Sequence, residues 1–337
     1  MLGTKCWETW NVIVGALHLH FGKAVMSRSV RSDPYYVGQY DVLIWCQWRL
    51  DDGDISLCSW DCSHEVINQI ATCLVGDTLT SIKIIPPFGD AEFIFSSGKT
   101  LKVFCNEVQG DDNSFNWSFG LINEAYYIGI NGKLESGKRL GILSGEPVEP
   151  PLITSDSNTL PVSINKFSYN KIDSACFEDF RKEFNLLIGQ CCHTVSNNEF
   201  SLRLDFGGTI KRTCTRKEHE EIDRDIQEEG EYDILIWCTW RLQDSNDAIC
   251  SSNCPDEVCE AGIKRLLDQK VISVEIFPPA CDATVTFSSG LVLKIFCNYT
   301  KDSETETNWF FRNVWKLYCV SHTQELEKAK INWNIIE

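Results

Sequence analysis

An alternating pattern of apolar and polar positions occurs twice in this chain. The sequence YDVLIWCQWRL runs from Tyr40 to Leu50, and YDILIWCTWRL runs from Tyr232 to Leu242, 192 positions later, with nine of the eleven positions identical. The residues are mostly β-branched, aliphatic or aromatic, which favours a central strand, and alternate side chains of a strand share one face. The chain is therefore predicted to be an internal duplication. One face of this strand should be buried in both copies, through Ile44, Trp48, Leu50, Ile236, Trp240 and Leu242.

The pattern after this stretch predicts the same elements in each copy. A short helix is expected from Glu65 to Val75, with an equivalent after Pro255, a residue that suits a first helical turn. Three strands should follow, the first ending at a Pro-Pro pair and the last two joined by Ser-Ser-Gly. The expected strands are 80–85, 92–95 and 101–105, then 271–277, 284–287 and 291–297. Each copy should be an α+β unit, an antiparallel sheet covered by one or two helices.

The segments before the shared strand differ. In the second copy, Phe180 and Phe184 share one face of an expected helix that ends before Gly189. WNVIVG at 10–15 resembles FNLLIG at 184–189, but the first copy then has 11 fewer residues before the shared Phe-Gly pair. We therefore expect a strand or hairpin to be missing from the first copy.

The 337 residues suit two domains, in agreement with the duplication. The stretch from Gly145 to Pro161 is rich in Pro and Ser and has no apolar period, as is typical of a linker. The predicted division is a shortened first repeat at 1–144, a linker at 145–165, a second repeat at 166–320 and a C-terminal tail at 321–337.

Charge is shared unevenly between the halves. The net charge is -17; residues 1–145 hold 16 acidic and 11 basic residues, a net of -5, which leaves -12 for the remainder. Eight acidic and three basic residues lie between Arg216 and Glu231, a segment expected to be a solvated loop or helix surface. Such a charge disfavours nucleic acid and membrane surfaces and favours a basic partner, although a solvated surface is the commoner explanation. The candidate partner-binding acids are Glu218, Glu220, Glu221, Asp223 and Asp225.

Targeting and redox signals favour a cytoplasmic protein. The sequence has no apolar run of about 18 residues and no basic start followed by an apolar block, so neither a membrane span nor a signal peptide is expected. Its 17 cysteines are an odd number in a large chain, which favours reduced thiols over a disulfide framework.

A recurring Cys-x3-Cys pattern is the most metal-like feature, because paired thiolates suit zinc. It comprises Cys58 with Cys62 and Cys250 with Cys254. His64 follows the first pair, but Asp256 takes its place after the second, so ordinary buried thiols are the favoured interpretation. No cofactor is predicted.

Arginine and tryptophan recur on one side of the shared strand. Arg49 lies on the same predicted face as Trp45, and Arg241 on the same face as Trp237, a pattern suited to a partner's carboxylate or aromatic ring. The alternative, an ion pair within the domain, is favoured. The tryptophans that follow Asn116 and Asn308 suit either the core or a partner contact.

Recurrent carboxylates provide a catalytic alternative. Four acids occupy equal positions in both copies, but turns and helix starts favour such residues for structural reasons. No histidine recurs to complete a familiar catalytic group. The recurring pairs are Asp41/Asp233, Asp52/Asp244, Glu65/Glu257 and Asp90/Asp282.

The order of elements resembles that of small bacterial α+β domains encoded near polymorphic toxins, some of which are immunity proteins. The motifs are a helix ending at Gly, a hairpin, the Trp-Arg-Leu strand, a second helix, a hairpin with F-S-S-G-x-x-L-K, and a final Asn-Trp. The resemblance covers 184–309 best and 40–117 well. It implies a non-enzymatic interaction protein, such as an immunity-type inhibitor of a basic toxin. A small-ligand or metal-binding regulator and a hydrolytic enzyme using the recurrent carboxylates are the alternatives.

Overall fold

The structure is a computed structural model, and it divides the chain into two compact units. The first unit is Met1–Asn170 with Asn246–Ala248 and Asn298–Glu304; the second is Lys171–Ser245, Ile249–Cys297 and Thr305–Glu337. The described residues are 1–12, 15–27, 34–109, 114–139, 142, 146–151, 173–198, 201–218, 221–300, 307–322 and 326–330. At 131, 212–218, 221–227 and 330 only the backbone is described.

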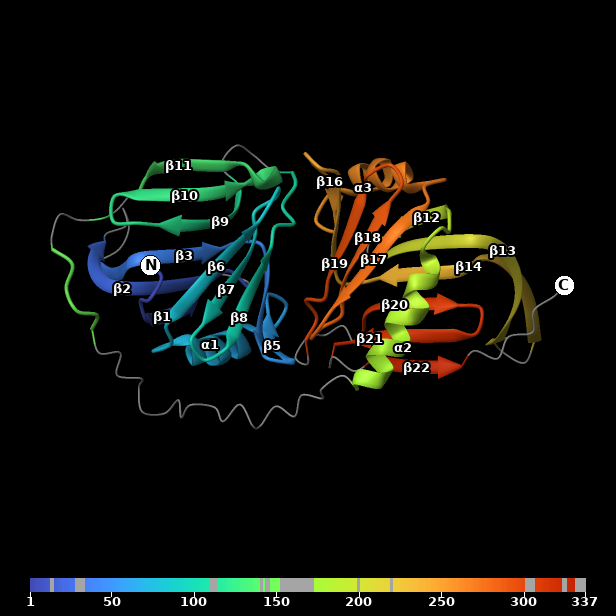
Figure 1. Cartoon of the computed structure of the whole chain (residues 1–337), viewed down its shortest axis with the longest axis horizontal. Helices are drawn as coiled ribbons and strands as arrows, with labels where there is room; N and C mark the ends of the chain where they lie inside the picture. The colour runs from blue at the N-terminus through green and yellow to red at the C-terminus, as the bar shows by residue number, and fades with distance from the viewer. Residues whose placement is uncertain are drawn as a thin grey trace. The chain divides into compact units, whose positions relative to one another are not determined.

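The first unit contains two antiparallel sheets. Its strands are β1 (Cys6–Asn11), β2 (Leu17–Ser27), β3 (Tyr35–Ile44), β4 (Gln47–Asp52), β5 (Ile55–Ser59), β6 (Leu79–Ile85), β7 (Asp90–Phe95), β8 (Lys99–Phe104), β9 (Phe115–Gly120), β10 (Glu124–Gly129) and β11 (Leu134–Lys138). One sheet has the order β1-β2-β3-β9-β10-β11 and the other β5-β4-β8-β7-β6, so the five-stranded sheet is inserted in sequence between β3 and β9 (Figure 1). The helix α1 (His64–Ala71) begins after Ser63, whose hydroxyl accepts the amide hydrogen of Val66.

The second unit repeats this strand order. Its strands are β12 (Cys192–Asn198), β13 (Ser201–Glu218), β14 (Glu221–Ile236), β15 (Thr239–Gln243), β16 (Ala248–Ser251), β17 (Val271–Phe277), β18 (Asp282–Phe287), β19 (Val292–Phe296), β20 (Thr307–Asn313), β21 (Lys316–Ser321) and β22 (Leu326–Lys330). The sheets are ordered β12-β13-β14-β20-β21-β22 and β16-β15-β19-β18-β17. Two helices belong to it, α2 (Ser174–Phe184) and α3 (Asp256–Ile263). The antiparallel prediction is confirmed, but each unit has two sheets and is richer in strand than the predicted α+β fold, because short helices connect or cover strands that form most of the described chain.

The stretch that is repeated in sequence is not one strand. β3 ends at Ile44 and β4 begins at Gln47, and these strands belong to different sheets. Between them the chain bends, and the Trp45 amide donates to the Asn116 carbonyl at 2.8 Å. The second unit bends at the same place, between Ile236 and Thr239. The single-strand prediction is therefore wrong, because a corner between two sheets leaves the apolar pattern uninterrupted.

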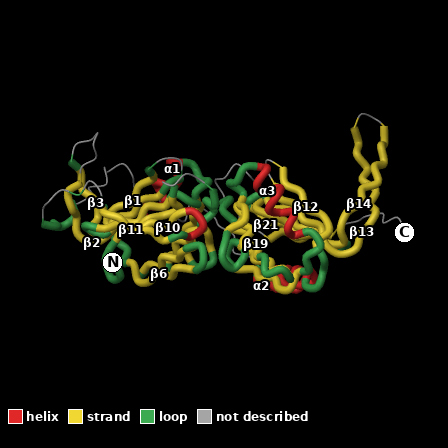
Figure 2. The backbone as a smooth tube through the Cα atoms, turned by 90° about the horizontal axis from the view of Figure 1, so that it is seen from above, coloured by secondary structure: helices red, strands yellow, loops and turns green. Residues whose placement is uncertain are grey.

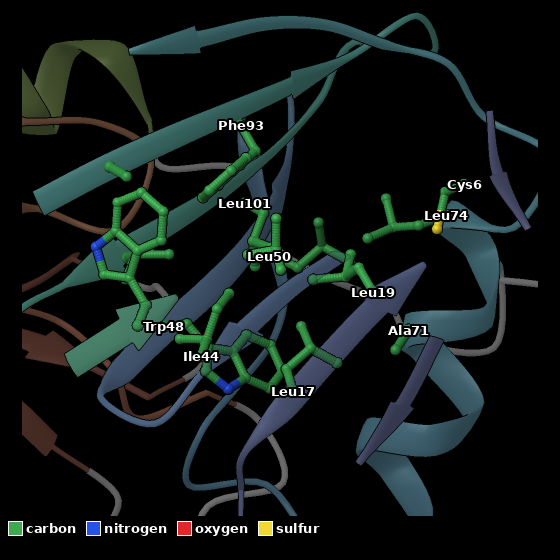
Figure 3. Packing of buried hydrophobic residues seen from close by; sticks show 14 of the residues in the cluster. Cys6, Leu17, Leu19, Ile44, Trp48, Leu50, Ala71, Leu74, Phe93 and Leu101 are labelled. Carbon is green, nitrogen blue, oxygen red and sulfur yellow. The ribbon is translucent and has the colours of Figure 1, made fainter. Parts of the chain in front are cut away.

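The predicted core residues are nevertheless confirmed as buried. Ile44 is buried in the six-stranded sheet and Trp48 and Leu50 in the five-stranded sheet, and all three join one core (Figure 3). Ile236, Trp240 and Leu242 are buried likewise. The Trp48 indole donates to the Gly15 carbonyl at 2.7 Å. A side chain on Gly15, which has a φ of +86°, would meet the Trp60 indole at 2.6 Å, so this close approach requires glycine.

The predicted loss of a hairpin from the first unit is wrong. β1 pairs with β2 as β12 pairs with β13, and Cys6 faces Phe21 as Cys192 faces Phe206. The Gly3 amide donates to the Leu79 carbonyl as the Gly189 amide donates to that of Val271. Gly3, not Gly15, is therefore the counterpart of Gly189. The two units can therefore be compared from Gly3 and Gly189 onward, and α2 precedes this shared part.

A long hairpin replaces the predicted acidic loop of the second unit. β13 and β14 pair without interruption from Thr209 and Gly230 to Glu218 and Glu221, and Figure 2 shows these arms rising from their sheet. The β13 arm carries Lys211, Arg212, Arg216 and Lys217, so a basic strand runs beside the acidic one. Lys211 Nζ lies 3.5 Å from Glu228 Oε1. The backbone register thus places Lys211 opposite Glu228 and Arg216 opposite Asp223, whereas Glu218 faces Glu221.

Residues in the predicted linker and in the predicted tail both pair with strands of the sheets. Val148, within the predicted linker, forms a β-bridge with Ala24 of β2, while 152–165 lie outside the described residues. β22 lies within the predicted tail and is an edge strand, which corrects that prediction; 331–337 lie outside the described residues. Among the described helices, none is long and apolar enough to cross a membrane.

Candidate functional site

The recurrent arginines make contacts within their own units. Arg49 Nε lies 2.8 Å from Asp51 Oδ1, and Ser56 also donates to that carboxylate. In the second unit Arg241 Nε donates to the side-chain oxygen of Gln243 at 2.9 Å. The structure therefore places Arg49 in the ion pair within the domain that was the alternative to partner binding.

The recurrent tryptophans do not share a strand face with these arginines, because the corner separates them. Trp45 and Trp237 are half-buried at the bends, and the Trp237 ring packs 5.5 Å from that of Phe310. Trp117 and Trp309 are in the core, and their indoles donate to the carbonyls of Gly89 and Cys281.

The acidic candidates are only partly described. Glu220 lies outside the described residues, and so do the side chains of Glu218, Glu221, Asp223 and Asp225. Their backbone forms the hairpin, in which Asp223 faces Arg216. Reversing the charge of Asp223 would therefore place two basic residues opposite each other in the hairpin.

The paired cysteines are not part of the group of potential metal ligands found among the described residues. Cys58 and Cys250 lie at the ends of strands, and Cys62 and Cys254 lie in the loops that follow. Burial raises the pKa of Cys250 to about 12, which disfavours the thiolate that zinc requires. The structure thus supports the interpretation as ordinary buried thiols.

The recurrent carboxylates have separate structural roles. Asp90 accepts the Cys105 amide hydrogen at 2.9 Å, and Asp282 accepts that of Cys297 at 2.8 Å. Glu65 and Glu257 lie in the first turns of helices, where acids are favourable. Asp41 differs, because it lies in a cluster of histidines.

That cluster occupies the outer face of the six-stranded sheet of the first unit. His18 Nε2 lies 2.8 Å from Asp41 Oδ2, and Arg139 reaches the same oxygen at 3.1 Å. The His18 and His20 rings are 4.2 Å apart, and Trp10 packs on both. Burial acts to raise the pKa of Asp41, but the hydrogen bond from His18 and the charge of Arg139 outweigh it and lower that pKa. The carboxylate is held ionised.

A metal ion needs ligand atoms whose lone pairs are free. The hydrogen bonds of this cluster indicate which of its atoms have such lone pairs. Ligand atoms of His18, His20 and Asp41 lie within 4.8 Å of one another. However, His20 Nδ1 accepts the Gly38 amide hydrogen at 2.8 Å, so the proton of the neutral ring is on Nε2. His20 then presents an N–H, not a lone pair, and Arg139 places a positive charge beside Asp41. The arrangement fits a hydrogen-bonded cluster better than a three-ligand metal site.

The equivalent outer face of the second unit is a network of ion pairs. Arg312 donates to Asp233, and its guanidinium also lies 2.8 Å from Glu229. Arg203 lies 3.2 Å from Asp205. In the first unit Gly120 occupies the position of Arg312, and a side chain there would overlap Asp41 at 1.9 Å. Arg139 supplies the missing cation from the end of β11.

On the inner face of the same sheet, the second unit has a helical cover. Phe180 and Phe184 of α2 are fully buried, and their rings lie 5.0–6.4 Å from those of Trp309, Phe311 and Tyr318. Phe311 and Tyr318 are themselves fully buried. Figure 1 shows α2 running across β20, β21 and β22. Aromatic residues four positions apart thus close this face.

Polar contacts hold α2 at its edge. Tyr318 donates its hydroxyl hydrogen to Asp179 at 2.6 Å, and Lys328 also binds Asp179. Glu183 accepts from the Asn313 amide at 2.8 Å and pairs with Lys316. Two acids of one helix therefore face cations on β21 and β22.

The first unit presents the same face without a described helix. Its aromatic and aliphatic positions Tyr40, Phe119, Tyr126 and Leu134, here called the open face, match Tyr232, Phe311, Tyr318 and Leu326 in register. Phe119 and Tyr126 are half-buried instead of buried. Leu134 is 65% exposed, whereas Leu326 is half-buried and its carbonyl accepts from Cys176 of α2. The four positions thus have the same register in both units and differ in their exposure.

Charge on the open face is the reverse of that in the second unit. Glu124 stands where Lys316 binds Glu183, and Ser136 stands where Lys328 binds Asp179. Glu124 is exposed and accepts the Tyr126 hydroxyl hydrogen at 3.0 Å. This face therefore favours a basic group where α2 has an acid.

A groove in the second unit depends on α2. It has a volume of about 420 Å³ and lies between α2 and β17, with Arg181, Glu275 and the half-exposed Phe277 in its walls. Arg181 and Glu275 are the charged residues among its lining residues, and the others are apolar or amide side chains.

The sequence does not predict the open face, because the expected sites are residues that recur in both copies. The sequence predicts the helix that ends before Gly189, but it pairs this glycine with Gly15, whereas the backbone hydrogen bonds pair it with Gly3. The equal spacing of Tyr126 with Tyr318 and of Leu134 with Leu326 was a usable signal. No protein-family model and no curated protein matches this chain.

Proposed function

We propose that the protein is a non-enzymatic interaction protein whose first unit carries the partner-binding surface, while the second is a closed structural copy. The observation that carries the proposal is the pair of matching sheet faces. In the second unit α2 buries Phe311 and Tyr318, and in the first unit Phe119 and Tyr126 stay half-exposed beside the exposed Leu134. Exposed apolar residues grouped on one face of a sheet are typical of an interaction site.

Charge also supports a partner-binding surface on the first unit. Residues 1–145 carry a net charge of -5, and Glu124 is one of their exposed acids and lies at the open face. A basic partner, the class that the resemblance to immunity proteins implies, would be attracted to it. In the second unit, Glu228 of the acidic arm instead pairs with Lys211 of the same hairpin. The partner surface is thus proposed for the first unit, not for the more acidic second one.

A reconstituted complex tests the proposal. A protein captured with the full chain is purified, the complex is reconstituted, and amide hydrogen exchange is compared with and without it. Binding at the open face should slow exchange in β9, β10 and β11 and leave β20, β21 and β22 unchanged. A reconstituted partner that protects only the second unit would contradict the proposal, and so would repeated failure to reconstitute any captured protein.

A further inference from the structure

We propose that Cys254 and Cys259 of the second unit are a redox-active pair of thiols, which a small-molecule disulfide oxidises to an intramolecular disulfide. This inference does not depend on partner binding, because both side chains belong to one unit. The Cys-x3-Cys pattern occurs in both units, but α3 adds a third cysteine, Cys259, to the second. Ile67, which is fully buried in α1, occupies the equivalent place in the first unit.

The sulfur atoms of Cys254 and Cys259 both lie next to Ser251, at the turn that precedes α3. The Cys254 amide donates to the Ser251 carbonyl at 3.1 Å, which closes this turn. Cys254 Sγ lies 3.4 Å from the Ser251 backbone nitrogen, and Cys259 Sγ lies 3.1 Å from the Ser251 carbonyl oxygen. Cys259 Sγ is also 3.5 Å from the Cys254 carbonyl oxygen. The turn therefore brings a thiol of the loop within reach of a thiol of the helix.

The two thiols also interact with each other. Their hydrogen bond is the largest cause of the raised pKa of the Cys259 thiol, and burial adds to it. Cys259 therefore stays protonated and can donate to Cys254 Sγ, which also accepts the amide hydrogen of Ser251. Hydrogen bonds to a sulfur favour its thiolate, which is the form that attacks a disulfide. Cys254 is accordingly the attacking thiol of the pair.

Exposure to solvent supports the same roles. Cys254 is half-buried, so a small disulfide can reach its sulfur, whereas Cys259 is only 2% exposed. Cys250 is fully buried under α3, where a side chain on Gly262 would meet its sulfur at 2.4 Å. In the first unit Cys62, the counterpart of Cys254, is buried as well. Of these cysteines, Cys254 is therefore the one that an oxidant meets first.

The reaction consists of two thiol–disulfide exchanges, written here for oxidised glutathione. The Cys254 thiolate attacks one glutathione sulfur, which forms a mixed disulfide and releases one glutathione thiolate. Cys259 then loses its proton and attacks Cys254 Sγ, which forms the protein disulfide and releases the second glutathione thiolate. The protein gives up two thiol protons and two electrons, and the two glutathione molecules leave as thiols that carry both.

Oxidation of the full chain in a glutathione buffer tests the proposal. The remaining thiols are alkylated, and the protein is digested without reduction by trypsin and a protease that cleaves before aspartate. Cleavage before Asp256 separates Cys254 from Cys259, so their disulfide joins two peptides and is identified by mass spectrometry. The Cys250→Ala chain should give the same pair of linked peptides, because Cys250 takes no part in the reaction.

Substitutions separate the two steps of the reaction. Cys259→Ile introduces the residue of the first unit, Cys259→Ala avoids the larger side chain, and circular dichroism should show that both variants are folded. Without the second thiol, the mixed disulfide of Cys254 with glutathione should accumulate to about tenfold or more above the wild-type level. Cys254→Ala should instead leave Cys259 reduced, because its sulfur is buried. Cys62→Ala is the matched control in the first unit and should leave the Cys254–Cys259 disulfide unchanged.

Three results would overturn the inference. These are absence of a Cys254–Cys259 disulfide in the wild-type chain, a wild-type disulfide of either residue with Cys250 in its place, and equal amounts of mixed disulfide in the wild-type chain and both Cys259 variants. None of them bears on the exchange experiment with a reconstituted partner, so the proposed function can stand or fail separately.

Discussion

The two units place the same aromatic sheet face in different surroundings. In the second, α2 closes the face with Phe180 and Phe184, and the polar edge of the helix is satisfied by Lys316 and Lys328. In the first, the matched residues lie on a half-exposed surface that carries Glu124. The comparison shows that the same register of aromatic residues is fully buried where a helix packs on it and half-buried in the other unit. The predictions below test how far this difference extends.

The largest effect is expected from removing an aromatic residue of α2. Phe184→Ala should destabilise the second unit by about 3–5 kcal/mol, because the ring is fully buried against Trp309 and Phe311. Native-state hydrogen exchange of β20 and β21 measures the change within that unit. Leu186→Ala, at a site that is 46% exposed, is the control and should cost about 0.5 kcal/mol. A loss for Phe184→Ala below about 1 kcal/mol would mean that α2 is not an essential cover.

A matched pair of substitutions should separate the two faces. Phe311→Ala should cost about 3–5 kcal/mol, and Phe119→Ala roughly half as much, because Phe119 is only half-buried. Denaturant unfolding, followed by hydrogen exchange to assign each loss to its unit, provides the measurement. Equal losses would show that the open face is closed in solution.

Acid should weaken the attachment of α2. Hydrogen bonds from Lys328 and Tyr318 lower the pKa of Asp179 from 3.8 to about 2. A carboxyl group with a lowered folded-state pKa contributes its stability above the unfolded pKa and loses it as the pH falls through the folded value. Stability of the second unit should therefore decline between pH 3.8 and about 2, and Asp179→Asn should remove this part of the decline. An identical acid profile for the variant would exclude Asp179 as its source.

The smallest effect is spectroscopic. Burial raises the pKa of Tyr318, and its hydrogen bond to Asp179 adds to the shift. The pKa of Tyr126 is raised mainly by its hydrogen bond to the exposed Glu124. Ultraviolet titration should therefore show Tyr126 ionising at lower pH than Tyr318, with Tyr126→Phe and Tyr318→Phe assigning the two steps. Ionisation of both tyrosines at the same pH would mean that the two faces are equally covered.

Much of the fold could be predicted from the sequence because its signals are local. In each copy a strand that ends at Pro-Pro is followed by two strands joined by Ser-Ser-Gly, and all of them are short. The predicted strand 271–277 has the same bounds as β17. The corner after Ile44 could not be seen, because both strands bury the same side of a continuous apolar run. The hairpin from Thr209 to Gly230 was missed for another reason. Its arms are paired through the backbone, and their sequence has no regular alternation of apolar and polar residues.

The candidate site could not be predicted because it depends on a tertiary contact. Nothing in the residues 115–138 shows that a helix covers the same face elsewhere in the chain. Likewise, His18 and His20 were overlooked because the other unit carries Arg203 and Asp205 at these positions. Residues that recur in both copies identify the strands that the two units share. The histidine cluster lies at positions where the residues of the two units differ.

The insertion of one sheet within the other has a consequence for folding kinetics. Ile44 of β3 pairs with Trp117 of β9, although the whole five-stranded sheet lies between them in sequence. Closing so long a flexible loop is entropically costly, but the cost falls if the intervening strands are already folded and hold their ends together. We therefore expect β4 to β8 to form first and the pairing of β3 with β9 to follow. Pulse-labelled hydrogen exchange during refolding should protect β7 before β9, and the time to complete each six-stranded sheet would then depend on the five-stranded sheet that it flanks.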